Sequence, residues 1–505
     1  MTTYYVETTG NDGNSGLVGF PKLTIKGALD VCSLAGGDTV VVGAGDFVAR
    51  VDIDYSFESE TIVIGAGDTT KIKSSTNSAI FSNGISKNLT FKDVSIERNA
   101  STDLYVMLIN GAGSVENLKF EECHFEPHAS YTGSGAIMSW VGAAKNITFD
   151  NCRYTQRDGS VFISSSGNVE GLALGVTADL PNNMTSSFVT VNNNIGHLDC
   201  TGLRVSGAAT TATRVLSITS TSNNSTADLT GAYVNVADGA GIQLSNDNST
   251  EWASVNIDGK CYLRSDSNPF MIDGRARNVF IKKGHYICNG DKPAISVGKD
   301  GESGQEIYNV QIDQVYTRSS TGHSMLIGNA VDGFSVTDSA IMSGDSSLVV
   351  KGQHGIIKGN YIGGGTLSAL LYKGARNIDT FNNTIFASGA GAHCFNITDN
   401  TTPAIATLNT RTYGNNMIAS DSAEIFDLAN EATIGSTHQI RGNNYEGVWG
   451  TILGAAITAD SSDRAAGQAA FSGYSIADML ALRPGVSYTE NMARIAAIKT
   501  AQLGA

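Results

Sequence analysis

The sequence has little proline, few charged side chains and no long apolar run. Only 7 of its 505 residues are proline. Proline cannot donate to a β-ladder, so its scarcity is compatible with a chain built largely of strands. No run of 18 apolar residues occurs, which excludes an apolar membrane-spanning helix. No apolar stretch typical of a secretory signal follows Met1, so no export by that route is expected.

Cysteine is present but forms none of the usual cysteine motifs. The 7 residues are scattered and show no CxxC pair or His-paired zinc spacing. They are Cys32, Cys123, Cys152, Cys200, Cys261, Cys288 and Cys394. Most fall at apolar positions, which predicts buried free thiols in a reducing compartment, with a Cys123–Cys152 disulfide as the alternative. No convergent set of carboxylates indicates a calcium site, so we expect neither a metal nor a cofactor.

The balance of charge limits the possible partners. A net charge of −15 argues against general nucleic-acid binding, which needs a basic surface. One segment runs against this trend, with the basic residues Arg275, Arg277, Lys282, Lys283, Lys292 and Lys299. This segment indicates either a contact surface for an acidic glycan or a solvated face paired with acids such as Asp266 and Asp273.

One stretch of the sequence occurs in three similar copies. Residues 85–99 read ISKNLTFKDVSIERN, residues 114–128 read SVENLKFEECHFEPH, and residues 143–157 read AAKNITFDNCRYTQR. The copies are 29 residues apart, and a fixed period of this length is typical of repeat architectures. Each copy alternates apolar and polar residues as a strand does. One copy cannot bury its apolar side alone, so the copies must stack.

The alternation assigns a direction to each side chain. In the second copy Phe120 points inward, the chain bends at Glu122, and Phe125 then points inward with His124 outward. The interior columns are Val94, Cys123 and Cys152, followed by Ile96, Phe125 and Tyr154. The outward columns are Lys92, Glu121 and Asp150; Ser95, His124 and Arg153; Glu97, Glu126 and Thr155; and Asn99, His128 and Arg157.

A looser form of the motif returns later in the chain. Aligning DSAI, GNYI, NNTI, NNMI and GNNYE places Ser339, Asn360, Asn383, Asn416 and Asn444 in one column. A column of asparagines at these intervals predicts a ladder of side-chain amides that bond from turn to turn. The alternative is that asparagine only favours turns here. The 57 glycines agree with many tight bends.

The beginning of the chain has a pattern of its own. A strand at residues 3–8 is followed by the loop GNDGNSG, by residues 23–35 with Ile25, Ala28, Leu29, Cys32 and Leu34 on one helical face, and by the strand 38–47. This run resembles the opening of right-handed parallel β-helix proteins of the pectin-lyase-like superfamily. The resemblance implies an amphipathic helix over the first coil, but no activity, because that superfamily contains lyases, hydrolases, epimerases and non-catalytic binders.

These observations predict an all-β fold, a right-handed single-stranded parallel β-helix (solenoid) with an N-terminal capping helix and a short helical C-terminal segment. The expected organisation is a cap at 1–45, the β-helix at 46–454 and a helical cap, oligomerisation or docking segment at 455–505. In the last segment Met492, Ile495, Ala496, Ile498 and Lys499 form a modest apolar stripe.

At the level of the β-helix the chain resembles bacteriophage tailspikes. This resemblance implies a homotrimer in the virion tail, made in the host cytoplasm, whose partners are a host surface polysaccharide and other tail proteins. Neither nucleic acid nor membrane insertion is expected. Three functions stay open: a tailspike-like protein that binds and in one version depolymerises the polysaccharide, a structural or receptor-binding fibre without catalysis, and a bacterial polysaccharide lyase or hydrolase.

The outward columns supply the candidate site residues. Glu121, Glu126 and Asp150 are candidate catalytic carboxylates, because like charges on stacked strands should raise one pKa, as glycosidic cleavage requires. A lyase would instead use a base and a cation, for which His124, Arg153 and Arg157 are candidates. Trp140 is a candidate platform for a sugar ring. The alternative is that all these are ordinary exposed strand residues.

A second candidate cluster lies nearer the middle of the sequence. It consists of Asp266, Asp273 and Arg275, and Trp252 and Tyr262 flank it in the sequence. Its carboxylates would serve catalysis, and Arg275 and Trp252 would contact substrate.

Overall fold

The computed structural model describes most of the chain up to residue 465. The described residues are 1–48, 51–52, 55–73, 81–82, 85–97, 107–109, 113–127, 136–155, 161–180, 187–208, 214–222, 224–246, 250–259, 261–298, 306–364, 366–398, 400–401, 404–420, 422–428, 439–446, 448–452, 455–456 and 464–465. The chain forms two compact units: unit 1, Met1–Gly239 with Ser249–Trp252, and unit 2, Ala240–Asn248 with Ala253–Ala505.

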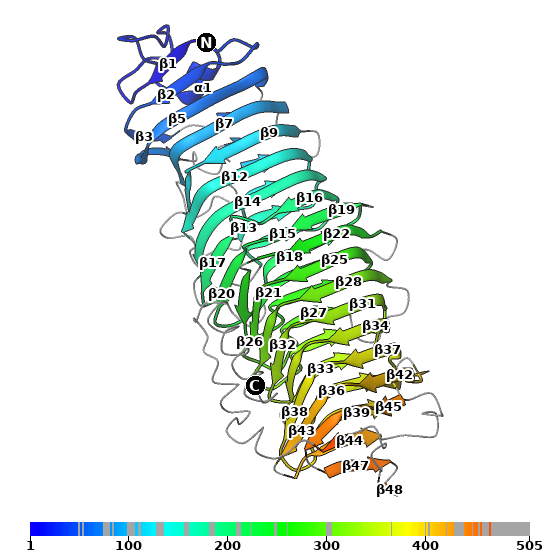
Figure 1. Cartoon of the computed structure of the whole chain (residues 1–505). Helices are drawn as coiled ribbons and strands as arrows, with labels where there is room; N and C mark the ends of the chain where they lie inside the picture. Colours follow the sequence, from blue (N-terminus) through cyan, green and yellow to red (C-terminus); the bar gives the residue numbers. More distant parts are fainter. Residues whose placement is uncertain are drawn as a thin grey trace. The chain divides into compact units, whose positions relative to one another are not determined.

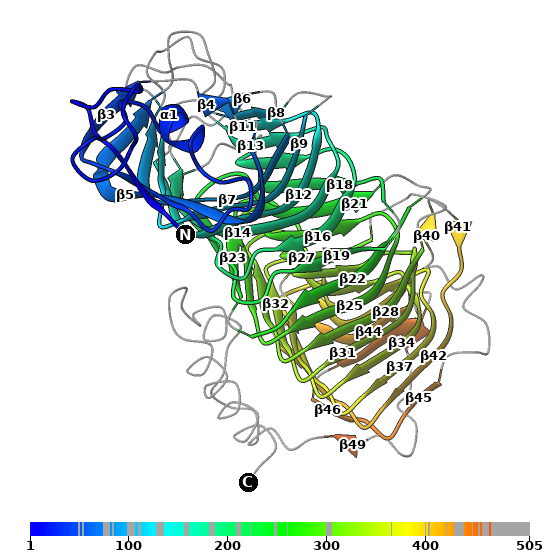
Figure 2. The same cartoon turned by 90° about the horizontal axis from the view of Figure 1, so that it is seen from above.

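Both units are built as a parallel β-solenoid. The strands of each sheet come from successive turns and pair in parallel, so the chain winds as a right-handed parallel β-helix (Figures 1 and 2). We number the three sheets in the order in which one turn visits them. The predicted fold class is therefore confirmed, whereas the three domain boundaries stay predictions.

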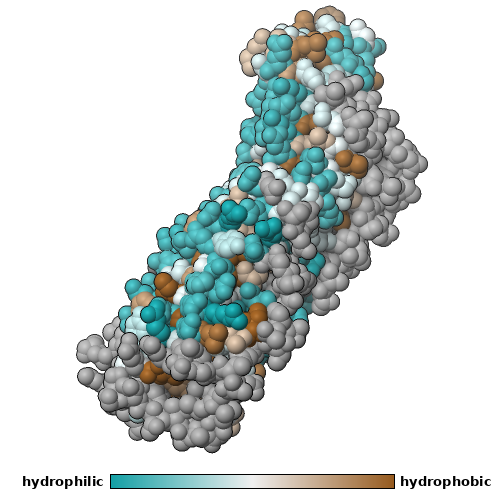
Figure 3. All heavy atoms as spheres, turned by 90° about the vertical axis from the view of Figure 1, so that its right-hand side faces the viewer, coloured by the Kyte–Doolittle hydropathy of each residue, from teal (hydrophilic) through white to brown (hydrophobic). Residues whose placement is uncertain are grey.

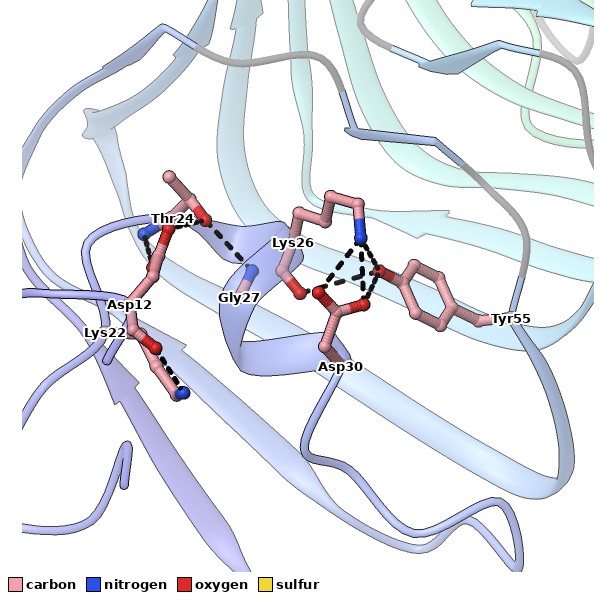
Figure 4. Close-up of polar contacts among 7 residues, drawn as sticks. All are labelled: Asp12, Lys22, Thr24, Lys26, Gly27, Asp30 and Tyr55. Atoms are coloured by element: carbon pink, nitrogen blue, oxygen red, sulfur yellow. Dashed lines mark hydrogen bonds and ion pairs between the residues drawn. The ribbon is translucent and has the colours of Figure 1, made fainter. Parts of the chain in front are cut away.

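The N-terminal part of unit 1 combines one helix with the first strands. Helix α1 (Ile25–Leu29) begins after Thr24, whose hydroxyl accepts a hydrogen bond from the Gly27 amide at 2.9 Å. The Asp12 carboxylate holds this start, since its Oδ1 accepts from the Thr24 amide at 2.9 Å (Figure 4). At the other end Tyr55 donates to Asp30 at 2.7 Å. These contacts fix α1 beside β1 (Thr3–Val6) and β2 (Thr39–Val42).

The helix is shorter than the sequence predicts. It ends at Leu29, and Leu34, expected on its apolar face, is 68% exposed. The Asp38 carboxylate accepts a hydrogen bond from the Ser33 amide at 2.8 Å, which replaces a helical bond and turns the chain. The predicted role of the helix as a cover for the first coil stays a prediction.

In unit 1 the strands form three sheets. Sheets 1 and 2 together contain β1, β2, β3 (Gly45–Val48), β5 (Ser56–Lys73), β7 (Ile85–Glu97), β9 (Ser114–Glu121), β10 (His124–Glu126), β12 (Ala143–Thr155), β14 (Val169–Leu180), β16 (Ile195–Asp199), β17 (Arg204–Gly207), β19 (Ser225–Asp228) and β20 (Tyr233–Val236). Sheet 3 contains β4 (Val51–Asp52), β6 (Phe81–Ser82), β8 (Met107–Ile109), β11 (Ala136–Trp140), β13 (Val161–Ser165), β15 (Val189–Val191) and β18 (Arg214–Ser220).

The bend between sheets 1 and 2 falls on residues with left-handed backbone. Asp93, Glu122 and Asn151 have φ of 51°, 55° and 52°, so the chain turns at the position where the sequence predicts it. The interior columns are also confirmed: Phe125 pairs with Ile96 on one side and Tyr154 on the other, and all three are buried. This register lets interior rings meet, for example Phe120 and Phe149 with centroids 5.4 Å apart.

In unit 2 the same arrangement continues with its own strands. Sheet 1 contains the unit-2 part of β22 (Trp252–Ile257), then β25 (Ala276–Lys282), β28 (Ile307–Asp313), β31 (Val331–Thr337), β34 (Gln353–Lys358), β37 (Arg376–Phe381), β42 (Leu408–Tyr413) and β45 (Gln439–Arg441). Sheet 2 contains β23 (Tyr262–Ser265), β26 (His285–Cys288), β29 (Tyr316–Ser319), β32 (Ala340–Ser343), β35 (Tyr361–Gly364), β38 (Thr384–Ser388), β43 (Asn416–Ser420), β46 (Asn444–Glu446) and β49 (Arg464–Ala465).

The remaining strands of unit 2 complete its third sheet. These are β21 (Ala240–Asn246), β24 (Phe270–Asp273), β27 (Ile295–Val297), β30 (Met325–Ile327), β33 (Ser346–Val350), β36 (Ser368–Lys373), β39 (His393–Thr398), β44 (Glu424–Leu428) and β47 (Val448–Ile452). Two short antiparallel pairings are added by β40 (Asn400–Thr401) with β41 (Ala404–Ile405), and by β48 (Ala455–Ala456) with β47. The helical segment is predicted at 455–505, but its described residues, Ala455–Ala456 and Arg464–Ala465, form strands. The rest of the predicted segment lies outside the described residues.

The predicted asparagine ladder exists, with a correction at its end. Asn360 donates to Asn383, Asn383 to Asn415, and Asn415 to Asn443, through side-chain bonds of 2.9–3.0 Å. Asn416 and Asn444, which the sequence alignment places in the column, instead pair with each other in the sheet, and their preceding neighbours Asn415 and Asn443 take the buried positions. Each of these two pairs of consecutive asparagines fits the column in two ways when only the sequence is considered, and the structure places the first residue of the pair there.

The face of the molecule drawn in Figure 3 carries mostly polar side chains. Hydrophobic side chains are scattered among them. Among the described residues no helix is long and apolar enough to cross a membrane.

Candidate functional site

Two outward columns of sheet 2 in unit 1 bring together side chains of opposite charge. The first, the basic column, contains Lys71, His124, Arg153 and Arg204, with Ser95 and Thr177 between them in register. The second, the acidic column, contains Glu97, Glu126 and Asp179. The two columns lie on the same face because outward residues alternate along each strand, about 7 Å apart.

At the centre of the basic column, His124 and Arg153 share one carboxylate. Arg153 Nη2 lies 2.7 Å from Asp68 Oδ2, and His124 Nδ1 lies 3.3 Å from Asp68 Oδ1. On the opposite side of its ring His124 Nε2 lies 2.7 Å from the Thr155 hydroxyl. The imidazole is therefore held between Asp68 of β5 and Thr155 of β12.

Asp68 is the residue of this cluster that the sequence analysis misses. It lies in β5 where the pairing with β7 shifts register, next to Gly67 with φ of 68°. This irregularity turns Asp68 outward toward Arg153, which is 85 residues later in the chain. The glycines Gly65 and Gly67 inside a strand pattern were the available signal for a bulge.

The charges of this cluster follow from its contacts. The hydrogen bond from Arg153 lowers the pKa of the Asp68 carboxyl, which is therefore ionised at neutral pH. Burial, followed by the positive charge of Arg153, lowers the pKa of His124, so its imidazole is neutral. Arg153 and Asp68 are 56% and 64% exposed, whereas His124 is 15% exposed. Arg153 and Asp68 thus present a cation and an anion to solvent, and the neutral ring of His124, which contacts both, is held in place.

Glu97, the first residue of the acidic column, also forms ion pairs. Glu97 lies 2.7 Å from Lys71 and 3.7 Å from Lys73, and Lys73 in turn lies 2.7 Å from Asp46. The predicted catalytic residue Glu126 follows Glu97 in the column. The hydrogen bond to Glu97, and to a smaller extent the charge of Glu126, raise the pKa of Lys71. Cations and carboxylates therefore alternate over this face.

The predicted column of Glu121 and Asp150 exists, but its electrostatics differ from the prediction. Lys119 Nζ bridges the two carboxylates at 2.8 and 3.3 Å, and Lys92 lies 2.5 Å from Glu121. Hydrogen bonds from Lys119 and Lys92 lower the pKa of Glu121. The expected raised pKa is thus wrong for Glu121, because the lysines remove the repulsion between neighbouring carboxylates.

The structure also corrects the aromatic candidates. Trp140 and Trp252 are completely buried, so the expectation that they stack on a sugar ring is wrong. Trp140 is the last residue of β11, a strand in which four of the five residues are buried. Arg157 lies outside the described residues, as does His128.

The second predicted cluster is divided between sheets. Asp266 follows β23 of sheet 2, whereas Asp273 ends β24 of sheet 3, so the two carboxylates are not in one column. Arg275 pairs with Glu306 at 3.3 Å rather than with either aspartate. Tyr262 packs against buried apolar residues of sheet 2. Of the predicted site residues, the structure therefore brings together His124 and Arg153 but not this second set.

A groove of about 390 Å³ follows sheet 1 of unit 1. Its charged lining alternates in sign: Lys145 lies 3.9 Å from Glu116 and 3.4 Å from Glu170. The remaining lining is small or polar, namely Ser114, Val115, Ala143, Ala144, Asn168, Val169, Asn194, Gly196 and Ser222. Such a groove offers hydrogen-bonding groups beside small apolar side chains. In the described residues no group of three His, Cys, Asp or Glu side chains is placed to hold a metal ion.

No family model and no curated protein matches the sequence. Solved structures similar to it include the A-module of an Azotobacter vinelandii mannuronan C-5 epimerase, with 14% identity, coverage of 88% of this chain and 94% of that chain, and a TM-score of 0.28. Tailspike protein 3 of bacteriophage CBA120 is 11% identical over 88% of this chain, with a TM-score of 0.33, and the match spans 61% of that chain. The catalytic domain of a GH87 alpha-1,3-glucanase is 12% identical over 80% of this chain and 64% of that chain, with a TM-score of 0.29.

Proposed function

We propose that this protein binds an acidic cell-surface polysaccharide along the basic and acidic columns of unit 1, as a tailspike-like receptor-binding protein. The observation that carries the proposal is the Asp68–His124–Arg153 cluster. It holds an exposed guanidinium, 56% accessible, beside an exposed carboxylate on a rigid sheet. Arg153 would pair with a sugar carboxylate, and Asp68 would accept hydrogen bonds from sugar hydroxyls.

The repeat supports binding to a polymer rather than to a single sugar. Lys71, Arg153 and Arg204 recur in one column, three strands and two strands apart, which is about 14 Å and about 10 Å at ~4.8 Å per strand, so a long chain would meet cations at repeated intervals. Because the strands are fixed by pairing above and below, little conformational entropy is lost when the site is occupied.

The finer parts of the proposal are a phage tail origin and a homotrimer. The state of the cysteines supports synthesis in a reducing compartment, since all seven are buried and none is in a disulfide. Cys123 and Cys152 each donate to a backbone carbonyl, of Phe91 and Phe120 respectively, at 3.3 Å. A structural or receptor-binding fibre without catalysis would have the same site.

The test is binding of purified full-length protein to acidic and neutral polysaccharides. We expect retention of polygalacturonate or hyaluronate, but not dextran, by immobilised protein, weakening as salt is raised from 50 to 500 mM. Arg153→Ala should weaken binding at least tenfold, and Arg153→Lys should restore part of it. Arg411→Ala is the matched control, because Arg411 is also exposed and paired with an aspartate, Asp379. Equal binding by Arg153→Ala and the parent chain would contradict the proposal.

Cleavage is a second candidate, favoured by the position of His124 beside Arg153, whose Nη2 lies 3.2 Å from His124 Nδ1. A neutral imidazole could take the C5 proton of a uronate whose carboxylate Arg153 neutralises. The electron pair of the C–H bond then forms the C4–C5 double bond, the C4–O bond breaks, and a proton from water completes the leaving hydroxyl. Incubation with the bound polysaccharide should release unsaturated uronates that absorb near 232 nm; unchanged absorbance and polymer length would leave binding alone.

A further inference from the structure

Four neighbouring strands of sheet 2 in unit 1 carry their outward side chains in an alternating order. Each of β12, β14, β17 and β20 has one outward residue in the basic column and one in the acidic column. From strand to strand these pairs are Arg153 with Thr155, Thr177 with Asp179, Arg204 with Ser206, and Tyr233 with Asn235. A strand with a cation therefore has a hydroxyl beside it, whereas the strand between the two cations has a hydroxyl and a carboxylate.

Ion pairing within the sheet does not explain this order. Arg204 is exposed, and within the part of the chain that the structure describes its guanidinium forms no ion pair or hydrogen bond. Asp179 is also exposed, and its carboxylate accepts a hydrogen bond from the Ser206 hydroxyl at 3.2 Å. The second cation and the carboxylate before it are therefore both accessible to a ligand.

The spacing of the two guanidinium groups limits which polymer can use both. Arg153 and Arg204 are two strands apart, which is about 10 Å at ~4.8 Å per strand. An extended polysaccharide that crosses the strands advances by a length similar to one strand spacing with each sugar unit. Carboxylates at both cations therefore belong to every second unit. The unit between them lies over Thr177 and beside Asp179, where a carboxylate would be repelled and a hydroxyl would donate a hydrogen bond.

The fourth strand offers a neutral sugar a different contact. Tyr233 follows Arg204 in the basic column and is partly exposed. The side-chain amide of Asn235 donates to the Tyr233 hydroxyl at 3.3 Å, which orients the ring. An aromatic ring presents an apolar surface to the C–H face of a sugar and brings no charge. Tyr233 would thus supply the aromatic contact that the sequence analysis expects of the buried Trp140.

We propose that the acidic polysaccharide of the proposed function is one in which uronic acids alternate with neutral sugars, so this assignment rests on that function. Uronate carboxylates pair with Arg153 and Arg204, and the neutral sugars lie at Thr177 and Tyr233. A polymer of uronates alone places a carboxylate beside Asp179. It therefore binds more weakly, although it carries more charge.

The test compares two acidic oligosaccharides with the same number of sugar units. In hyaluronate oligosaccharides glucuronate alternates with N-acetylglucosamine, whereas in oligogalacturonates every unit is a uronate. Calorimetry with the purified full-length protein should show that the hyaluronate oligosaccharide binds about tenfold more tightly, the effect of one unfavourable contact with a charge. General attraction between opposite charges predicts the reverse order. Equal or tighter binding of the oligogalacturonate would overturn the alternating assignment and leave the proposed function, whereas binding of neither would contradict both.

Two double variants exchange the residue pairs of neighbouring strands. Thr177→Arg with Asp179→Ser gives β14 the pair of β17 and should reverse the preference in favour of the oligogalacturonate. Arg204→Thr with Ser206→Asp gives β17 the pair of β14 and should weaken binding of the hyaluronate oligosaccharide about tenfold. An unchanged preference in the first variant would overturn the proposal.

A matched control repeats the first exchange on another sheet. Thr226 and Asp228 have the same residue types and spacing on β19 of sheet 1, and both are partly exposed. Thr226→Arg with Asp228→Ser changes the net charge of the chain by the same amount and should keep the preference of the parent. All three variants change only outward positions, so their circular dichroism should stay that of the parent. A reversal in the control would show that net charge decides the preference, and it would overturn the proposal.

Discussion

His124 and His285 occupy the same outward position at the start of sheet 2 strands, one in each unit, and differ in their surroundings. His124 lies between Asp68 and Arg153, whereas the ring of His285 lies 6.4 Å from that of Tyr262 and 5.5 Å from that of Tyr316. Burial lowers the pKa of both imidazoles. The same residue type thus contacts charged side chains in one unit and is buried beside aromatic rings in the other.

At the scale of this residue, His285 should make stability depend on pH. Its pKa is about 4 in the folded chain and ~6.5 when unfolded, so the unfolded state binds more protons between these values. Stability is therefore full above pH ~6.5 and falls by about 3 kcal/mol as the pH drops to ~4. His285→Phe should remove most of this loss in urea unfolding measured from pH 4 to 7.5.

The control for this prediction is His354→Asn. His354 is exposed and has φ of 54°, which asparagine tolerates. This variant should keep the pH dependence of the parent. A parent chain whose unfolding midpoint is constant between pH 4 and 6.5 would contradict the assigned role of His285.

At the scale of the element, the buried asparagine ladder holds the bends of unit 2 in register. Asn383 accepts hydrogen bonds from the amide and side chain of Asn360, and it donates to Asn415 and to the carbonyl of Ile357. The side-chain amide of Asn383 thus accepts a hydrogen bond from the asparagine of one neighbouring coil and donates one to the asparagine of the other. The ladder explains why these bends need no proline or disulfide.

Removing one buried amide should therefore be costly. Asn383→Ala leaves the amide of Asn360 without its acceptor and should reduce the free energy of unfolding by about 2–4 kcal/mol. The control Asn377→Gly removes an exposed ladder amide at a φ of 55°, which glycine adopts freely, and should cost less than about 1 kcal/mol. Denaturant midpoints of the two variants measure the difference, and similar losses would show that burial does not strengthen the ladder.

The interior column of unit 1 allows a second test of an element. Phe125 is fully buried, with ring centroids 5.3 Å from Phe120 and 5.5 Å from Phe162. Phe125→Asp places a carboxylate there without a partner and should destabilise unit 1 by several kcal/mol or prevent its folding. Thr177→Asp, at an exposed outward position, should change stability by no more than ~0.5 kcal/mol. Comparable yields and unfolding midpoints for both variants would contradict the assigned directions.

At the scale of the whole molecule, we predict that the chain associates as a trimer. The prediction follows from the sequence resemblance to tailspikes. Light scattering of the purified protein should give a mass near three times the 52.8 kDa of one chain. A mass near that of a single chain would contradict it.

The sequence by itself determined the repeat and the direction of its side chains. Alternation and a 29-residue spacing are local properties, so Phe125 could be assigned inward and His124 outward without coordinates. The ladder was also visible, but the Asn415-Asn416 doublet fits two registers, and only the pairing of Asn416 with Thr384 separates them.

The candidate site depended on contacts that no local pattern contains. Asp68 reaches Arg153 across 85 residues through an irregularity in β5, and Lys119 reaches both Glu121 and Asp150 from a neighbouring column. Trp140 looked available for a sugar but is buried. Local periodicity states which way a side chain points, whereas charge pairing and cover depend on which distant residues the winding of the chain places beside it.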